Sequence, residues 1–135
     1  MATEIGSLLI DMRADVARLA QDMARALAHL HQRGVMHGDF YAHNILWDPA
    51  NGQALLSDFG AGTLLPVDQP ALSRALQALE VRAFGYLLEE LLAHAVPEAT
   101  HAATLATVDA LARGCQNALP AHRPTMADVA NALAV

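Results

Sequence analysis

The sequence has few of the residues that mark several common classes of protein. Only one of its 135 residues is cysteine, and eight are lysine or arginine against fourteen aspartate or glutamate. Cys115 cannot form a disulfide within the chain, which is typical of a reducing compartment, and we expect it to be a buried apolar residue. The net charge of −6 leaves no basic stripe for a phosphate backbone, so nucleic-acid binding is disfavoured.

Long apolar segments are also missing. Apolar residues make up 54% of the chain, but no apolar run reaches the roughly 18 residues of a membrane span. The N-terminus has no basic segment followed by an apolar segment and a cleavage site, as a secretory leader would have. We therefore expect a cytoplasmic protein that does not bind a membrane. Its length fits one domain, residues 1–135, with a real core.

A long amphipathic helix and a small hairpin are predicted in the first half of the chain. Between residues 11 and 33 apolar side chains recur three or four apart, and Gly34 follows where a helix commonly ends. Two short apolar runs, 45–47 and 54–56, are separated by the turn sequence DPANG. They predict a small β-hairpin with polar residues at both of its ends.

The second half is predicted to be helical. Helices are expected near residues 68–78, 80–94 and 99–113. Thr125 and Asp128 resemble a capping box, so a final helix should run from Met126 to about Leu133. The predicted fold class is mainly α with a small β-hairpin.

Three side chains with oxygen atoms flank the hairpin: Asp39, Asn44 and Asp58. Mg²⁺ prefers oxygen ligands and often shares one or two carboxylates with a substrate phosphate. Asn44 and Asp58 suit that role, and Asp39 would then be free to accept a hydroxyl proton during phosphoryl transfer. Taken singly, each of the three also has a simpler explanation, because Asp and Asn are common turn residues.

The order and spacing of these residues resemble the protein kinase superfamily. HGDFYAHN at 37–44 resembles the catalytic loop H-R-D-L-x-x-x-N, and residues 58–60 match D-F-G. Further along, 83–92 looks like the central buried helix of the kinase large lobe, and PAHRPT at 120–125 looks like its P-x-x-R-P segment. The long helix at 11–33 fits as well. The resemblance thus covers nearly the whole chain and implies a kinase-like C-terminal lobe, with the N-terminal lobe absent from this chain.

By resemblance, the chain would use ATP and Mg²⁺ to transfer a phosphoryl group to a protein hydroxyl. The expected catalytic residues are Asp39, as the base or orienting group, and Asn44. The expected metal ligands are Asn44 and Asp58, and the cofactor-binding residues are Leu46, beneath the adenine, and Asp58.

Several residues depart from the kinase pattern. Gly38 stands where many kinases have an Arg that pairs with a phosphorylated activation loop, so Thr63 and Ser73 are not expected to act as switch sites. Tyr41 replaces the usual Lys of Ser/Thr kinases. His43 either compensates partly as an imidazolium or only hydrogen-bonds a nearby loop.

Other residues keep or lose supporting roles by the same resemblance. His37 and Phe59 match residues that stack together and hold the loop. Glu80 occupies the place of an Asp that accepts bonds from the catalytic-loop backbone. The stretch from Gly60 to Glu80 contains no A-P-E motif, so Arg123 lacks the Glu with which it would pair in kinases and needs another partner.

The largest departure concerns the small lobe. Nothing before the long helix resembles a glycine-rich loop, a strand Lys or a helix Glu. ATP would then meet half a cleft with an exposed apolar floor at Ile45, Leu46 and Trp47. The expected partners are a protein substrate or the missing N-terminal lobe, with no nucleic acid.

Two alternatives stay open. One is a small-molecule kinase of the aminoglycoside phosphotransferase type, a family whose loop typically reads H-G-D. The other is a pseudokinase or truncated lobe that acts as a binding module.

Overall fold

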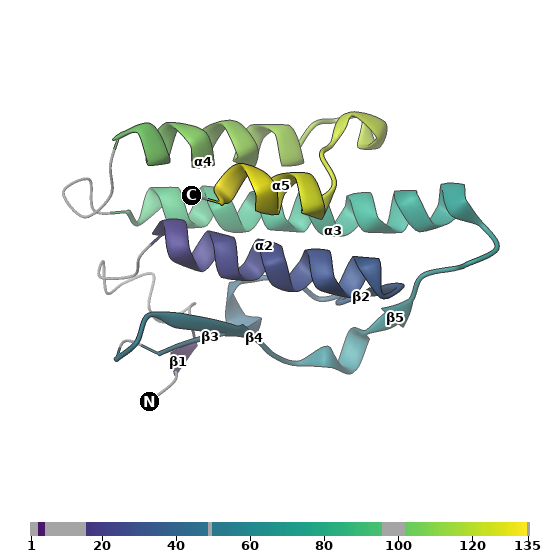
Figure 1. Cartoon of the computed structure of the whole chain (residues 1–135), viewed down its shortest axis with the longest axis horizontal. Coiled ribbons are helices and arrows are strands. Elements are labelled where there is room, and N and C mark those ends of the chain that lie inside the picture. Colours follow the sequence, from purple (N-terminus) through teal and green to yellow (C-terminus); the bar gives the residue numbers. More distant parts are fainter. Residues whose placement is uncertain (1–2, 5–15, 49, 96–101, 135) are drawn as a thin grey trace.

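The computed structural model describes residues 3–4, 16–48, 50–95 and 102–134. Its helices pack together as a bundle, and two small antiparallel sheets lie along one side of that bundle (Figure 1). The helices are α2 (Val16–Gln32), α3 (Pro70–Ala93), α4 (Ala102–Cys115) and α5 (Met126–Leu133). The strands are β1 (Thr3–Glu4), β2 (Val35–Met36), β3 (Ile45–Asp48), β4 (Gln53–Leu56) and β5 (Thr63–Leu64).

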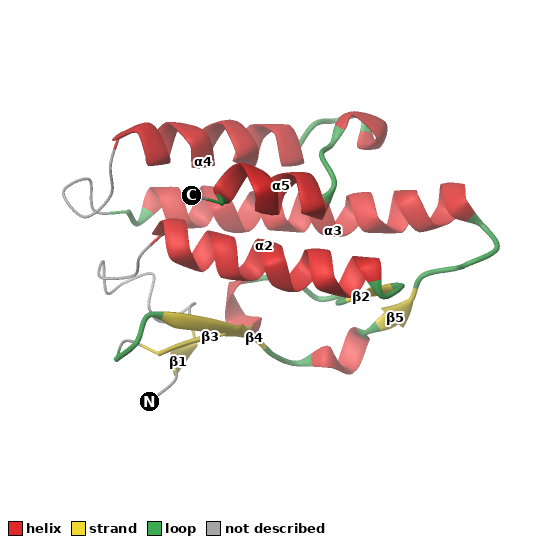
Figure 2. Ribbon diagram, in the orientation of Figure 1, coloured by secondary structure: helices red, strands yellow, loops and turns green. Residues whose placement is uncertain are grey.

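The predicted class, mainly α with a small hairpin, is confirmed. Figure 2 shows the helices and the strands in different colours, and the strands pair in the orders β1-β3-β4 and β2-β5. Short 3₁₀ turns at Ala42–Asn44, Phe59–Ala61 and Pro120–His122 connect the longer elements. Within the described ranges, none of the helices combines the length and apolar character needed to span a bilayer.

Helix α2 forms because its apolar residues fall on one face. Leu19, Met23 and Leu27 lie on that face and are fully buried, and each such side chain contributes about 2 kcal/mol by leaving water. Gly34 ends the helix as predicted, with a φ of 78° that favours glycine. The first part of the predicted helix, residues 11–15, lies outside the described residues.

The hairpin of β3 and β4 is fastened to α2 at its turn. Arg18 Nη1 donates to the carbonyl of Asn51 at 2.8 Å, and the backbone N–H of Ala54 donates to Asp22 Oδ2 at 3.3 Å. Because the chain continues from α2 through β2 into the loop of residues 37–44, these bonds fix the hairpin relative to that loop.

The prediction of an exposed apolar floor is wrong for two of its three residues. Ile45 and Trp47 are buried in the core, whereas Leu46 is only half-buried and pairs across the hairpin with exposed Leu55. Side chains along a strand alternate between its two faces, so three consecutive residues cannot all face one cleft. Leu46 alone is left on the outward face.

The two helices predicted at 68–78 and 80–94 are one continuous helix, α3, of 24 residues. Neither Gly nor Pro stands near Leu79 to interrupt it. Its buried face continues through Glu80, Val81 and Phe84, while Leu72 and Leu79 remain exposed. These exposed leucines obscured the helical period and suggested a break that does not exist.

Helices α3 and α4 are in close contact at Gly85. A Cβ at this position would lie 2.8 Å from the Cβ of Cys115 and 3.1 Å from the carbonyl oxygen of Ala112. Cys115 is fully buried there, as predicted. Burial raises the pKa of its thiol to about 11, although the positive charge of Arg123 opposes the shift. Cys115 is therefore a packing residue at neutral pH.

Helix α5 begins with the predicted capping box. Thr125 Oγ1 accepts from the backbone N–H of Asp128, and Asp128 Oδ2 accepts from the backbone N–H of Thr125, both at 3.1 Å. The helix runs from Met126 to Leu133 and buries Met126, Val129 and Leu133. Its boundaries match the prediction.

Candidate functional site

The loop of residues 37–44, which resembles the catalytic loop of kinases, begins at His37, which is buried and bonded on both ring nitrogens. Its Nε2 lies 2.8 Å from the carbonyl oxygen of Ser57, and its Nδ1 lies 3.2 Å from the backbone N–H of Asp39. A carbonyl only accepts and an N–H only donates, so the ring carries its proton on Nε2. The ring of Phe59 packs edge-on against it at 4.9 Å between centroids. His37 therefore supports the loop, and its contact with Phe59 agrees with the sequence prediction.

Asn44 joins the two ends of the catalytic loop. Its Nδ2 donates to the carbonyl of Asp39 at 2.7 Å and to Asp39 Oδ2 at 3.2 Å. These bonds occupy the amide nitrogen and leave Oδ1 as the side chain's acceptor. The side chain is buried, so its orientation is held firmly.

The segment after β4 is held against the same residue. Both the backbone N–H and the hydroxyl of Ser57 donate to the carbonyl of Asn44, at 2.8 and 2.9 Å. Asp58 follows directly, so the predicted residues Asp39, Asn44 and Asp58 come from two segments that hydrogen bonds draw together.

Asp58 has a strained backbone. Its φ of 58° and ψ of 72° are left-handed, and it is the one non-glycine residue with positive φ among those described. The carboxylate is exposed, and Oδ1 accepts a long bond of 3.5 Å from the backbone N–H of Gly60. Such strain costs roughly 1–3 kcal/mol and is commonly found at functional sites.

Glu80 of α3 supports the loop from beneath. Its Oε2 accepts from the backbone N–H of Gly38 at 2.8 Å, and its Oε1 accepts from the backbone N–H of His37 at 2.9 Å. His31 Nε2 also contacts Oε1 at 2.9 Å. Burial pushes the pKa of Glu80 upward, but the bonds from His31, Gly38 and His37 outweigh it and leave the pKa below its usual value. The charged carboxylate is therefore the form that holds the loop.

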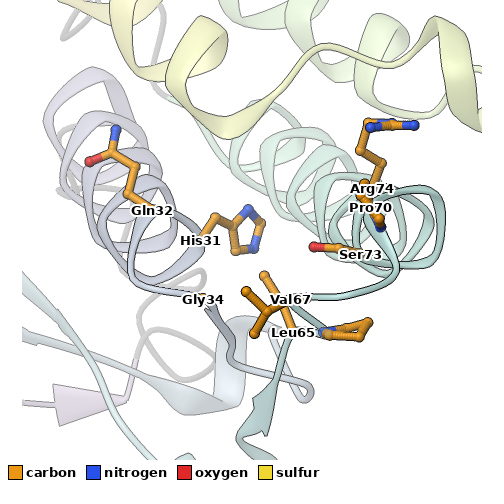
Figure 3. A pocket seen from close by; sticks show the side chains of 9 residues that line it. His31, Gln32, Gly34, Leu65, Val67, Pro70, Ser73 and Arg74 are labelled. Atoms are coloured by element: carbon orange, nitrogen blue, oxygen red, sulfur yellow. The ribbon is translucent and has the colours of Figure 1, made fainter.

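Sequence reasoning found Glu80 but missed His31. Figure 3 shows the His31 ring reaching from the end of α2 toward α3, where a cavity of about 360 Å³ opens beside it. The sequence did contain an indication of this role, because His31 lies in the last turn of a helix whose inward-facing side chains are otherwise apolar. A titratable residue near that face needs a buried partner.

Arg123, which the sequence left without a partner, bonds to backbone carbonyls. Its Nε donates to Asn117 at 2.9 Å, and its Nη1 donates to Ala78 of α3 at 3.0 Å. The guanidinium thus joins the α4–α5 connection to α3, and no carboxylate of the described residues pairs with it.

The two residues expected to modify the loop's charge, Tyr41 and His43, lie on its exposed side. Their rings contact each other edge-on, with centroids 5.5 Å apart. His43 makes no side-chain hydrogen bond with the part of the chain that the structure describes, so the alternative of a loop-bonding histidine receives no support.

The two residues predicted to be metal ligands would provide the oxygen donors for a divalent cation. Within the described ranges, His, Cys, Asp and Glu side chains do not gather in a group of three or more that could hold a metal. The predicted ligands would offer the Oδ1 of Asn44 and the carboxylate of Asp58. Two oxygen donors match the manner in which Mg²⁺ shares its coordination with substrate phosphates and water.

Comparison with known proteins agrees with the fold and with the resemblance to protein kinases. Residues 9–117 match the family model described as protein kinase domain. The chain is 42% identical over 60 residues to leaf rust 10 disease-resistance locus receptor-like protein kinase-like 1.3 of Arabidopsis thaliana, which is 44% of this chain and 9% of that protein. It is 39% identical over 51 residues to protein kinase gsk3 of Schizosaccharomyces pombe, which is 38% of this chain and 13% of that protein.

A solved structure shares the fold. It is a divergent kinase lacking the glycine-rich loop that regulates membrane ultrastructure of the Toxoplasma parasitophorous vacuole. The two superimpose with a TM-score of 0.76 at 22% identity, over 93% of this chain and 45% of that one. The chain spans less than half of that structure and 9–13% of the two curated relatives. With a family match over most of its length, the chain belongs to the protein kinase domain family.

Proposed function

We propose that this chain provides the phosphoryl-transfer half of an ATP- and Mg²⁺-dependent kinase that acts on a protein hydroxyl. The observation that carries the proposal is the bond from Asn44 Nδ2 to Asp39 Oδ2, 3.2 Å long, beside the segment that ends in Asp58. It orients a carboxylate and an amide oxygen in a loop that His37 and Glu80 hold rigidly.

The residues would divide the work as follows. Asp39 accepts or orients the proton of the attacking hydroxyl, and its bond to Asn44 fixes the carboxylate for that step. Asn44 and Asp58 hold the metal, which would neutralise charge on the transferring phosphate when bound. Leu46, on the outward face of β3, offers an apolar surface to the adenine.

A partner completes the proposed site. The outward face of the hairpin carries half-buried Leu46 and its exposed cross-strand partner Leu55, and Phe59 is 50% exposed nearby in sequence. We propose that an N-terminal kinase lobe, from the same longer protein or from another chain, covers this face. The protein substrate would then bind at the Asp39 side of the loop.

A second candidate is a binding module without catalysis. Exposed Tyr41 replaces a Lys that would stabilise the transferring phosphoryl, and loss of one such preorganised charge costs about 10²- to 10³-fold in rate. The small-molecule kinase remains an alternative because Gly38 gives the loop its H-G-D sequence.

Nucleotide binding is tested by thermal unfolding. ATP and Mg²⁺ added together should raise the melting temperature of the chain, and Asp58→Asn should abolish the rise. Asp68→Asn is the matched control, since Asp68 is exposed in the loop before α3. No rise with the intact chain would favour the binding module.

Transfer is tested with the whole protein and labelled ATP. Phosphorylation of protein or peptide hydroxyls, but not of small alcohols or aminoglycosides, would support the protein kinase proposal. Asp39→Ala should lower the rate about 10²- to 10⁴-fold, the range of general base catalysis. Full turnover by that variant would overturn the role of Asp39.

A further inference from the structure

A groove away from the catalytic loop lies between the first half of α3 and the connection from α4 to α5. Its cavity is about 460 Å³, within the roughly 300–1,000 Å³ that ligand pockets occupy. One wall is α3 from Ala71 to Val81, and the other is the segment from Pro120 to Thr125. Figure 1 shows this connection beside the first half of α3.

The lining of the groove is apolar and positively charged. Alanine, valine and proline side chains form most of it, and its two charged residues are Arg74 and Arg123. Among the residues that the structure describes, no Asp or Glu lines it. In a chain of net charge −6 with only eight basic residues, two arginines facing one apolar groove form a local field opposite in sign to that of the whole protein.

Arg123 is prepared to receive an anion. Its two bonds to Ala78 and Asn117 engage two of the five N–H donors of the guanidinium and hold it in place. One Nη1 donor and both Nη2 donors are left for a ligand. Because the side chain is half-buried, a carboxylate that binds there would form a charge-assisted pair that is stronger than a pair in open water.

Arg74 provides a second cation at the opposite wall. Its side chain is exposed and has no hydrogen bond or ion pair with the residues that the structure describes. It can therefore turn toward a ligand without breaking a contact in the fold.

We infer that this groove binds an acidic peptide segment of a partner protein, with one Glu or Asp carboxylate on Arg123 and a neighbouring apolar side chain in the cavity. A carboxylate suits the planar fork of a fixed guanidinium, and the apolar lining suits the flanking residue. The inference is independent of the proposed function, since binding requires neither nucleotide nor the catalytic loop.

The test uses two peptides and nuclear magnetic resonance. The chain, labelled with ¹⁵N and free of nucleotide, is titrated with acetyl-Ser-Ala-Leu-Glu-Ala-Ser-amide and with the same peptide carrying Gln in place of Glu. Resonances of α3 near Ala75 and Ala78 and the Arg123 side chain should shift. The Gln peptide should bind about tenfold or more weakly, and higher salt should weaken only the Glu peptide.

Variants separate binding from folding. Arg74→Gln should weaken binding of the Glu peptide about 3- to 10-fold. It should leave the melting temperature unchanged, because the Arg74 side chain makes no hydrogen bond or ion pair with the described residues. Arg123→Lys keeps the charge but loses the planar guanidinium, and it should weaken binding of the Glu peptide about tenfold or more. Arg82→Gln, on the same helix but outside the groove, is the matched control and should bind normally.

Three results would overturn the inference. One is equal affinity for the Glu and Gln peptides, and another is resonance shifts that lie away from the groove or do not occur at millimolar peptide. The third is a phosphoserine peptide that binds more than tenfold tighter than the Glu peptide, since the preferred ligand would then be a phosphate.

Discussion

Gly38 and Ala61 are in direct backbone contact across the site. Gly38 has a φ of 85°, and a Cβ built on it would lie well inside van der Waals contact with the carbonyl oxygen of Ala61. The strands on either side explain the contact, because Met36 of β2 pairs with Thr63 of β5 and draws the two segments together. The backbone at position 38 thus requires glycine, which also explains why no Arg stands there.

Gly38→Ala should destabilise the fold more than Gly34→Ala does. Both glycines have positive φ, but nothing lies within 4 Å of a Cβ at Gly34. Gly34→Ala should cost about 1–2 kcal/mol from backbone strain alone, and Gly38→Ala should cost about 1–3 kcal/mol more from the steric overlap. Urea unfolding measures both, and equal losses would contradict the close contact with Ala61.

The three bonds to Glu80 predict that Glu80→Gln loosens the catalytic loop. A glutamine offers one acceptor oxygen and turns an NH₂ group toward donors, which should cost about 1–3 kcal/mol of unfolding free energy at pH 7. Glu90→Gln is the matched control on the same helix, because Glu90 is exposed, and it should change stability by less than about 0.5 kcal/mol.

The lowered pKa of Glu80 predicts that the difference in stability between the wild-type protein and Glu80→Gln depends on pH. The pKa of Glu80 is lowered on folding, so its contribution to the free energy of unfolding is complete above the usual value of 4.5. That contribution is lost as pH falls through the lower pKa of the folded state. The difference between the wild-type protein and Glu80→Gln should therefore be constant from pH 7 to about pH 5 and shrink at more acidic pH. A difference that persists unchanged to pH 3 would show that ionisation of Glu80 is not what holds the loop.

The capping box of α5 gives a further prediction. Thr125→Ala removes the acceptor for the backbone N–H of Asp128 and should cost about 1 kcal/mol. Thr107→Ala is the control, since Thr107 is exposed within α4 and bonds only its own helix. Similar losses in urea unfolding for both variants would mean that the cap adds no stability to α5.

Local sequence patterns predicted the parts of this fold that local chemistry determines. Gly34 ends α2, β3 and β4 pair as a hairpin, and Thr125 caps α5, because each of these features involves neighbours in the chain. The contact of His37 with Phe59 and the bonds of Glu80 were predicted through the resemblance to kinases.

The features that were missed depend on distant segments. The pairing of β2 with β5 involves two residues on each strand, too few for any periodicity to reveal. Arg123 donates to backbone carbonyl groups. Every residue has such a group, so residue types in the sequence do not indicate which one accepts the bond. The continuity of α3 was hidden by exposed Leu72 and Leu79, whose positions relative to the core depend on where the other helices pack.

The buried thiol of Cys115 predicts a loss of stability at alkaline pH. Its pKa is about 11 in the folded protein, above the usual 9.0, so the folded state retains a proton that the unfolded state releases. Stability contributed by the thiol is therefore complete below pH 9 and falls between pH 9 and 11 by about 1.4 kcal/mol per unit. Cys115→Ala removes the titrating group and should flatten that part of the stability curve, although the smaller side chain lowers stability at every pH. Urea unfolding of both proteins from pH 7 to 11 measures the two slopes, and parallel curves would contradict the raised pKa.

A thiol reagent provides a second readout, because the native protein should react at pH 8 only as fast as it opens.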